Sequence, residues 1–182
     1  MSSVAVFRRP HEPLVEDLED AFREHSRLVY RTAYSVTGSA QDAEDVVQTL
    51  FLQLLRRGLP PEFRKNPKGY LYRAAVNLSL NAVKSRRRQA MAVDPKQLDV
   101  ADNGPDGREA AAKDDLQARL IDAIATLNPR AVEMLILRYE HDTSEAEIGR
   151  LLGTSRAVVA VTLFRARARL KKLLRASSGD PS

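Results

Sequence analysis

Apolar residues recur every three or four positions over two long stretches of this 182-residue chain, and a segment without such periodicity separates them. The first stretch runs from Leu14 to Arg88 and the second from Asp114 to Arg175. This spacing is typical of helices that bury one face. Aromatic residues make up only 5% of the chain, which disfavours a β-sandwich. We therefore expect an all-α protein with two small helical domains.

Capping and breaking residues predict where the helices begin and end. In the first stretch, helices are expected over residues 14–36, 39–57 and 67–88, with a Pro- and Gly-rich loop over 58–69. In the second, they are expected to begin near Asp114 and at Pro129, which follows an Asn128 cap. Ser144 and Ser155 are expected to cap two further helices. Gly153 lies between these two and predicts a helix-turn-helix.

Residues 89–113 are rich in Asp, Pro, Gly and Ala and predict a flexible acidic linker. Residues 1–13 and 176–182 lack apolar periodicity and are expected to be tails. The expected organisation is thus a first domain over residues 14–88 and a second over 114–175.

Composition argues against several classes of protein. The chain has no cysteine, which excludes disulfides, thiolate metal sites and cysteine nucleophiles. His11, His25 and His141 are dispersed, and no Gly-rich phosphate loop is present, so we expect no catalytic residue, metal or cofactor. The most apolar stretch, Val46 to Leu55, has only ten residues and contains three polar ones. A cytoplasmic protein that is not an enzyme is expected.

The net charge of +5 hides blocks of opposite sign. The net charge is −6 over residues 12–45 and −4 over residues 94–115. It is +9 over residues 56–88 and +8 over residues 150–175. One basic block can be a solvated helix face, but two blocks on helical segments favour a polyanion-binding surface. A short helix, a Gly turn and a basic second helix are in turn typical of DNA binding through the major groove. Nucleic acid is the expected partner.

Two motifs resemble bacterial sigma-70 family factors. Residues 42–51, Asp-Ala-Glu-Asp-Val-Val-Gln-Thr-Leu-Phe, and residues 70–78, Tyr-Leu-Tyr-Arg-Ala-Ala-Val-Asn-Leu, resemble region 2. Residues 123–174 resemble region 4, notably at Leu127-Asn128-Pro129-Arg130 and at Arg165-Ala166-Arg167-Ala168-Arg169-Leu170. The absence of segments long enough for regions 1 and 3 points to the extracytoplasmic function (ECF) subfamily.

The resemblance implies that the acidic helix of region 2 binds the β′ clamp helices of core RNA polymerase and that region 4 also docks on the β flap. The matching core polymerase-binding residues are Asp42, Asp45, Gln48, Phe51 and Leu52. Asp42 and Asp45 also complement the positive end of the helix dipole. Phe51 and Leu52 have core packing as an alternative role.

The same resemblance assigns residues 58–88 to the minus ten promoter element. Capture of unstacked bases requires stacking and hydrogen-bonding groups, and cations hold the phosphates. The candidate minus ten residues are the aromatics Phe63, Tyr70 and Tyr72, the amides Asn77 and Asn81, and the cations Arg64, Lys65, Arg73, Lys84, Arg86, Arg87 and Arg88. Tyr70 replaces the tryptophan that the family usually has, and each aromatic has core burial as an alternative.

The resemblance also assigns recognition of the minus 35 promoter element to the last helix. Its candidate residues are Ser155, Arg156, Ala157, Ala160, Val161, Thr162 and Arg165. Family members commonly carry a polar Thr-Val-Lys-Ser-Arg run where this chain has Val158-Val159-Ala160-Val161-Thr162. Either apolar contacts and DNA shape determine the minus 35 preference, or this helix has partly become a protein-binding surface.

The resemblance implies core RNA polymerase, promoter DNA and an anti-sigma factor as partners. The acidic linker is either a solvated spacer or a mimic of the transcript in the polymerase channel. Two alternatives to a sigma factor remain: a stand-alone helix-turn-helix regulator, which leaves the Asp42 to Phe51 motif unexplained, and a helical adaptor, which the two basic blocks disfavour.

Overall fold

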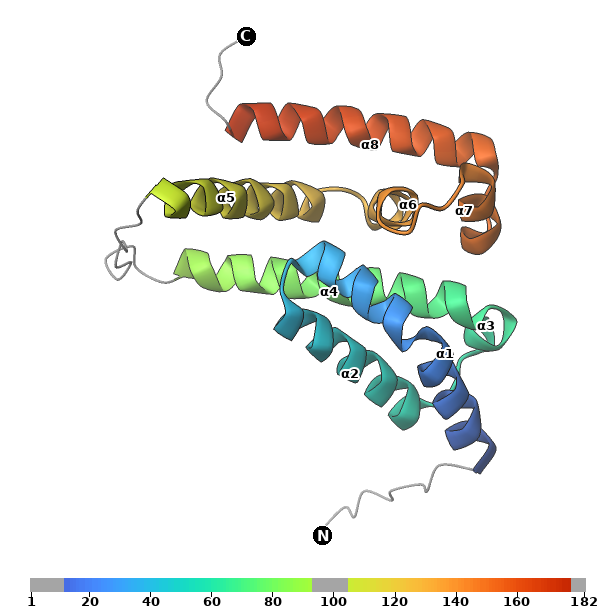
Figure 1. Cartoon of the computed structure of the whole chain (residues 1–182). Coiled ribbons are helices and arrows are strands. Elements are labelled where there is room, and N and C mark those ends of the chain that lie inside the picture. The colour runs from blue at the N-terminus through green and yellow to red at the C-terminus, as the bar shows by residue number, and fades with distance from the viewer. Residues whose placement is uncertain (1–11, 93–104, 178–182) are drawn as a thin grey trace.

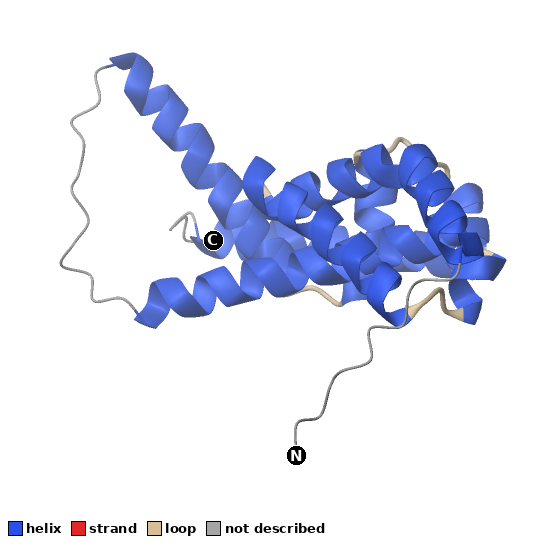
Figure 2. Cartoon of the chain, turned by 90° about the horizontal axis from the view of Figure 1, so that it is seen from below, coloured by secondary structure: helices blue, strands red, loops and turns tan. Residues whose placement is uncertain are grey.

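The computed structural model describes residues 12–92 and 105–177, and within these ranges every element is an α-helix (Figures 1 and 2). The elements are α1 (Glu12–Thr37), α2 (Ala40–Arg57), α3 (Pro61–Lys65), α4 (Pro67–Ala92), α5 (Pro105–Ala125), α6 (Pro129–Tyr139), α7 (Glu145–Leu152) and α8 (Arg156–Ser177). The predicted all-α class is confirmed. Among these helices, none is both long and apolar enough to span a bilayer.

The helix ends follow the predicted caps. The Ser39 side chain accepts a hydrogen bond from the Asp42 backbone N–H at the start of α2. Asn128 caps α6, and Ser144 forms a reciprocal capping box with Glu147 at α7. Such caps satisfy backbone N–H groups that have no partner inside the helix. Each cap depends on residues two or three positions apart, so the local sequence determines it.

Two segments are more helical than predicted. The expected loop over 58–69 contains α3, a short helix that begins with proline and buries Phe63. At the expected linker, α4 continues to Ala92 and α5 begins at Pro105 rather than near Asp114. The run Ala110-Ala111-Ala112 has high helix propensity, which explains the earlier start. Residues 93–104 of the predicted linker lie outside the described residues, as do most of the predicted tails.

The N-terminal half, α1 to α4, packs α1 and α2 against α4. Leu18, Leu50, Leu54, Phe63 and Leu71 form one buried cluster there. The C-terminal half, α5 to α8, lies along the opposite side of α4 (Figure 1). Most of the contact between the halves is made by α4, and α1 also touches α5 and α6.

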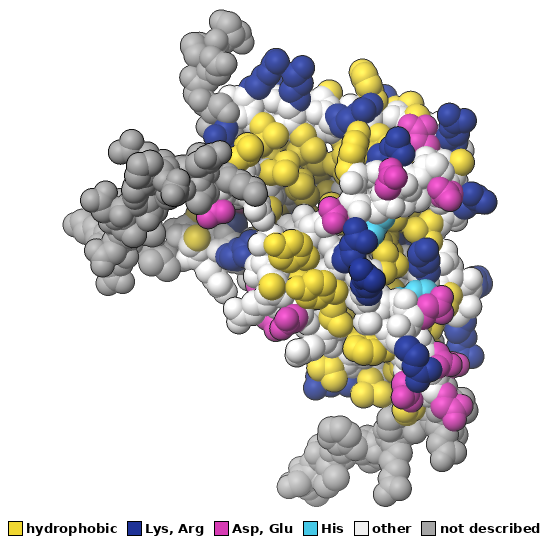
Figure 3. Space-filling model, viewed as in Figure 1, with side chains coloured by type: hydrophobic (Ala, Val, Ile, Leu, Met, Phe, Trp, Pro, Cys, Tyr) yellow, Lys and Arg dark blue, Asp and Glu magenta, His cyan; other side chains and the backbone are white. Residues whose placement is uncertain are grey.

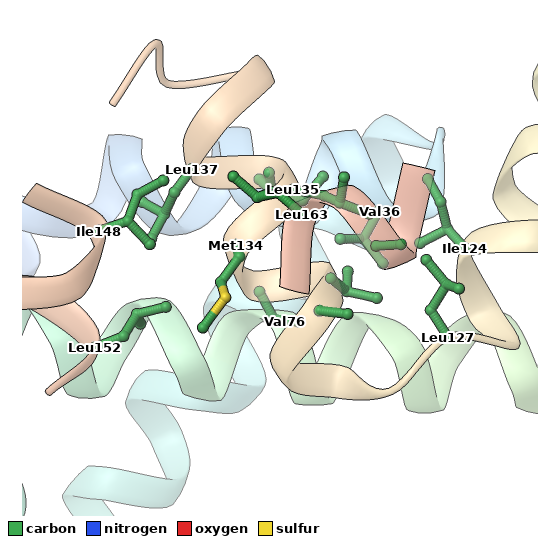
Figure 4. Close-up of a cluster of buried hydrophobic side chains, with 14 of the residues drawn as sticks. Val36, Val76, Ile124, Leu127, Met134, Leu135, Leu137, Ile148, Leu152 and Leu163 are labelled. Carbon is green, nitrogen blue, oxygen red and sulfur yellow. The ribbon is translucent and has the colours of Figure 1, made fainter. Parts of the chain in front are cut away.

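A single hydrophobic core joins the two halves. Val36 from α1 and Tyr72 and Val76 from α4 belong to the same buried cluster as Met134 from α6 and Leu163 from α8. Figure 4 shows Met134 and Val76 facing each other across the contact between α6 and α4. Met134 and Val76 are both fully buried. The halves therefore stabilise one another by burial of apolar surface.

Polar contacts accompany this core. The Tyr72 hydroxyl donates a hydrogen bond of 2.6 Å to the backbone carbonyl of Glu133. Thr32 Oγ1 and His141 Nε2 lie 3.0 Å apart, and Asn66 Nδ2 donates to the Leu151 carbonyl over 3.1 Å. Each of these contacts joins residues more than sixty positions apart in the chain.

Lowering the pH from 8 to 5 is expected to weaken the contact between the halves. Burial, and secondly the Arg31 guanidinium, lower the pKa of His141 below its ordinary value, although Glu140 opposes this. The unfolded chain therefore binds the proton first, and stability falls as the pH drops through about 6.5 until folded His141 is also charged. Urea unfolding at both pH values should show a loss in the wild type that His141→Gln lacks. Equal losses would contradict the role of His141.

Replacement of Gly149 by alanine is expected to destabilise the C-terminal half by about 1–3 kcal/mol, as overpacking does. A Cβ at Gly149 would lie 2.7 Å from the Thr154 carbonyl oxygen, which belongs to the backbone of the turn between α7 and α8. Thermal unfolding should be compared with Gly153→Ala, where a Cβ meets nothing within 4 Å although φ is +67°. A Gly149→Ala variant no less stable than Gly153→Ala would contradict this account of the turn.

Candidate protein and nucleic-acid interfaces

An apolar groove lies between α1 and α2. Phe22 is 48% exposed and Leu52 is 47% exposed, although both are large apolar side chains. The Phe22 and Phe51 rings meet edge to face with centroids 5.0 Å apart. The groove is lined mainly by Val15, Leu18, Phe22, Val47, Gln48, Phe51, Leu52 and Leu55. Contiguous exposed apolar surface of this kind is typical of a protein-binding site.

The predicted polymerase-binding residues divide between this groove and the start of α2. Gln48, Phe51 and Leu52 line the groove, and Asp45 is exposed less than one turn before Gln48. Asp42 is different, because its carboxylate accepts a 2.7 Å charged hydrogen bond from Arg86 of α4. Asp42 thus joins α2 to α4 in this structure.

A polar and basic surface follows one side of α4. Asn77, Asn81, Lys84 and Arg88 are exposed and lie at spacings of three and four residues, which places them on one helix face. Further exposed cations are Arg64 and Lys65 on α3, which precedes α4, and Arg87 near the C-terminal end of α4. Arg86 is turned toward the protein, since it also donates to the Thr37 carbonyl over 2.9 Å.

The predicted base-stacking aromatics are mostly covered. Phe63 is 4% exposed and meets Tyr70 edge to face with centroids 5.8 Å apart, while Tyr70 is half-buried. Tyr72 is fully buried under α6, and burial raises the pKa of its hydroxyl well above the ordinary value. In this arrangement neither Phe63 nor Tyr72 can stack on a base. Half-buried Arg73 lies beside Tyr72 in the chain, near Glu133.

The helix-turn-helix consists of α7, a turn at Gly153 and α8. Val159, Leu163 and Ala166 are its buried residues on α8. The predicted minus 35 residues Ser155, Arg156, Ala157, Val161 and Arg165 are exposed, whereas Ala160 and Thr162 are half-buried. Ser155 caps α8 by accepting from the Val158 N–H, and Arg156 lies 3.5 Å from the Glu145 carboxylate.

Several exposed apolar residues were not predicted as site residues. Phe22 and Leu55 line the α1–α2 groove, and Val158 and Phe164 lie on the outside of α8. Phe22 has the spacing of a core position, whereas Leu55, Val158 and Phe164 each lie directly beside a buried residue in the chain. This position directly before or after a buried residue is the only sequence signal that could have distinguished them from core residues.

Two family models match most of the described chain. Sigma-70 region 2 matches residues 21–89, and Sigma-70, region 4 matches residues 117–170. These ranges contain the α1–α2 groove, the basic surface of α4 and the helix-turn-helix, in that order. The chain belongs to the sigma-70 family.

Individual relatives agree with this assignment. The chain is 30% identical over 166 residues to the ECF RNA polymerase sigma factor SigE of Mycolicibacterium smegmatis, covering 89% of this chain and 63% of that protein. It is 29% identical over 154 residues to the ECF RNA polymerase sigma factor BldN of Streptomyces coelicolor, covering 84% of this chain and 58% of that protein. The chain thus spans about three fifths of the length of these two relatives.

A solved structure has a similar fold. It is the sigma factor RpoE in complex with the anti-sigma factor NepR from Bartonella quintana, with a TM-score of 0.50 and 21% sequence identity. The match covers 88% of this chain and 98% of that chain.

Proposed function

We propose that this chain is an ECF sigma factor that binds core RNA polymerase and directs promoter recognition, promoter melting and transcription initiation. Family membership supports this function, since region 2 and region 4 occur in the expected order. The proposed partners are the β′ clamp helices, the β flap, promoter DNA and an anti-sigma factor. The chain would act in the cytoplasm as a recognition subunit, without catalytic chemistry of its own.

The observation that carries the proposal is the α1–α2 groove. Gln48, Phe51 and Leu52 line it together with other exposed apolar side chains, which supports a protein contact at these residues. A few well-packed side chains near the centre of an interface, often aromatic ones, contribute most of its binding free energy. A helical partner that fills this groove would also meet the exposed carboxylate of Asp45.

Promoter binding is proposed to require separation of the two halves. Tyr72, a candidate for the minus ten element, is covered by α6 and hydrogen-bonded to the Glu133 carbonyl. Binding of the two halves to different parts of polymerase would expose α4 and hold the two DNA-binding surfaces at a fixed separation. Two weak sites then act together through their effective concentration. Binding of the free chain to a promoter should accordingly be weak and sensitive to salt.

The proposal is tested by size-exclusion chromatography of the full chain with sigma-free core RNA polymerase. Stoichiometric co-elution is expected for the wild type. The Asp45→Arg plus Gln48→Ala variant, changed only at exposed positions of α2, should fail to co-elute. Its circular dichroism spectrum should match that of the wild type.

Absence of co-elution of the wild type would overturn the proposal, provided the same core preparation binds another sigma factor. The stand-alone helix-turn-helix regulator would then become the favoured function. Co-elution of the variant at the wild-type level would instead show that polymerase binds elsewhere on the chain.

A further inference from the structure

The outer face of α8 carries large apolar side chains that nothing in the described chain covers. Val158 and Val161 are each 49% exposed and Phe164 is 67% exposed. These three residues are called the α8 strip. Val159, Leu163 and Ala166 pack α8 against the rest of the C-terminal half, so the strip is not needed for that packing.

Cations follow the α8 strip on the next turns of the helix. At about 100° per residue, Arg165 and Arg169 fall on one side of the outermost position, Val161, and Arg167 and Lys171 fall on the other. All four cations are exposed, and residues 150–175 contain no acidic residue. Figure 3 shows Lys and Arg side chains along the outer edge of α8 with hydrophobic side chains among them.

An apolar strip that is followed by exposed cations on the same helix is complementary to the major groove of duplex DNA. The phosphates of both strands border that groove, and the 5-methyl group of thymine is the apolar group that the base pairs present in it. The second helix of a helix-turn-helix contacts base edges through its N-terminal residues. Val158 and Val161 lie in the first two turns of α8. An apolar partner protein would leave these cations without counter-charges.

We infer that the α8 strip recognises thymine methyl groups and thereby sets the DNA sequence preference of the helix-turn-helix. This inference deepens the proposed function and depends on its DNA-binding component, but not on polymerase binding. The polar groups at the start of α8 already have partners within the chain, since Ser155 caps the helix and Arg156 lies 3.5 Å from the Glu145 carboxylate. Arg156 and Arg165 are assigned to phosphates, so methyl contacts would provide the discrimination between bases.

The strip is exposed in the chain as it stands, so the test needs no polymerase. The full chain is used at low salt to select from duplexes with a randomised ten-base-pair centre. Each enriched thymidine is then replaced by deoxyuridine, which lacks only the 5-methyl group. We expect binding about four-fold weaker at each contacted position, the value of one buried methyl group.

The variant Val161→Ser should remove the difference between thymidine and deoxyuridine at one or more positions. Val161→Thr, which keeps one methyl group, should retain part of it. The matched control is Leu116→Ser, because Leu116 is an apolar residue of α5 that is 54% exposed. This variant should distinguish thymidine from deoxyuridine as well as the wild type does.

Three results would overturn the inference. Enriched duplexes that bind equally with deoxyuridine would show that the sequence is read by other groups. Unchanged DNA binding by Val161→Ser would show that the strip serves another partner, such as a protein. Failure to enrich any sequence would exclude direct base readout by the free chain. Co-elution with core polymerase, measured separately, would in each case decide whether the proposed sigma function itself stands.

Discussion

Replacement of Leu52 by aspartate is expected to weaken binding of core RNA polymerase by at least about 30-fold while the chain stays folded. Leu52 is 47% exposed and lines the α1–α2 groove beside Phe51, so its loss removes little internal packing. In the proposed complex, however, an aspartate there would be buried among apolar side chains without a counter-charge. Truncation of a hot-spot residue at the centre of an interface costs about 2 kcal/mol or more of binding free energy, and an unpaired buried charge adds a desolvation penalty.

The measurement is the Kd for sigma-free core polymerase, with fluorescently labelled chain. The control is Met91→Asp, which introduces the same charge at a 73% exposed apolar residue of α4 outside the groove. The two variants should have the same thermal unfolding midpoint as the wild type. If Leu52→Asp and Met91→Asp bound polymerase equally, the groove would not be the polymerase-binding site.

The sequence predicted those features of the fold that depend on near neighbours. The caps at Ser39, Asn128 and Ser144 join residues two or three positions apart, and their donors and acceptors can be assigned from the chain alone. The helix-turn-helix followed in the same way from Ser144, Gly153 and Ser155. Only α3 was missed, because its five residues lie among Pro and Gly residues that also favour a loop.

The contact between the halves could not be predicted from the sequence. It depends on pairs such as Tyr72 with Glu133 and Thr32 with His141, which are 61 and 109 positions apart. Helical periodicity shows that Tyr72 faces one side of α4, but it does not identify the helix that covers that side. The aromatic residue therefore had two possible roles, and the structure places it in the core.

The structure gives the exposure of the predicted site residues. Asp45, Gln48 and Leu52 are exposed and therefore accessible to a partner. Phe22 was missed because an apolar residue at helical spacing has the same pattern whether it packs internally or binds a partner. The distinction requires the positions of neighbouring helices, and here α2 leaves Phe22 half uncovered.

Replacement of Met134 by alanine is expected to lower the free energy of unfolding by about 2–5 kcal/mol, the range for large-to-small changes at fully buried positions. Met134 lies at the contact with α4, in a cluster that includes Tyr72 and Val76 (Figure 4). The cavity would therefore weaken the packing of α4 as well as α6. Hydrogen exchange measured by mass spectrometry should become faster in peptides from both helices.

The matched control is Met91→Ala, the same chemical change at a 73% exposed position of α4, which should alter stability by less than about 0.5 kcal/mol. Faster exchange confined to α5–α8 in Met134→Ala would mean that the halves fold independently and that the shared core contributes little. Faster exchange that reaches Tyr72 would instead show that α6 holds this candidate DNA-binding residue buried. The same change should then strengthen promoter binding by the free chain, because part of the free energy needed to expose α4 has been removed.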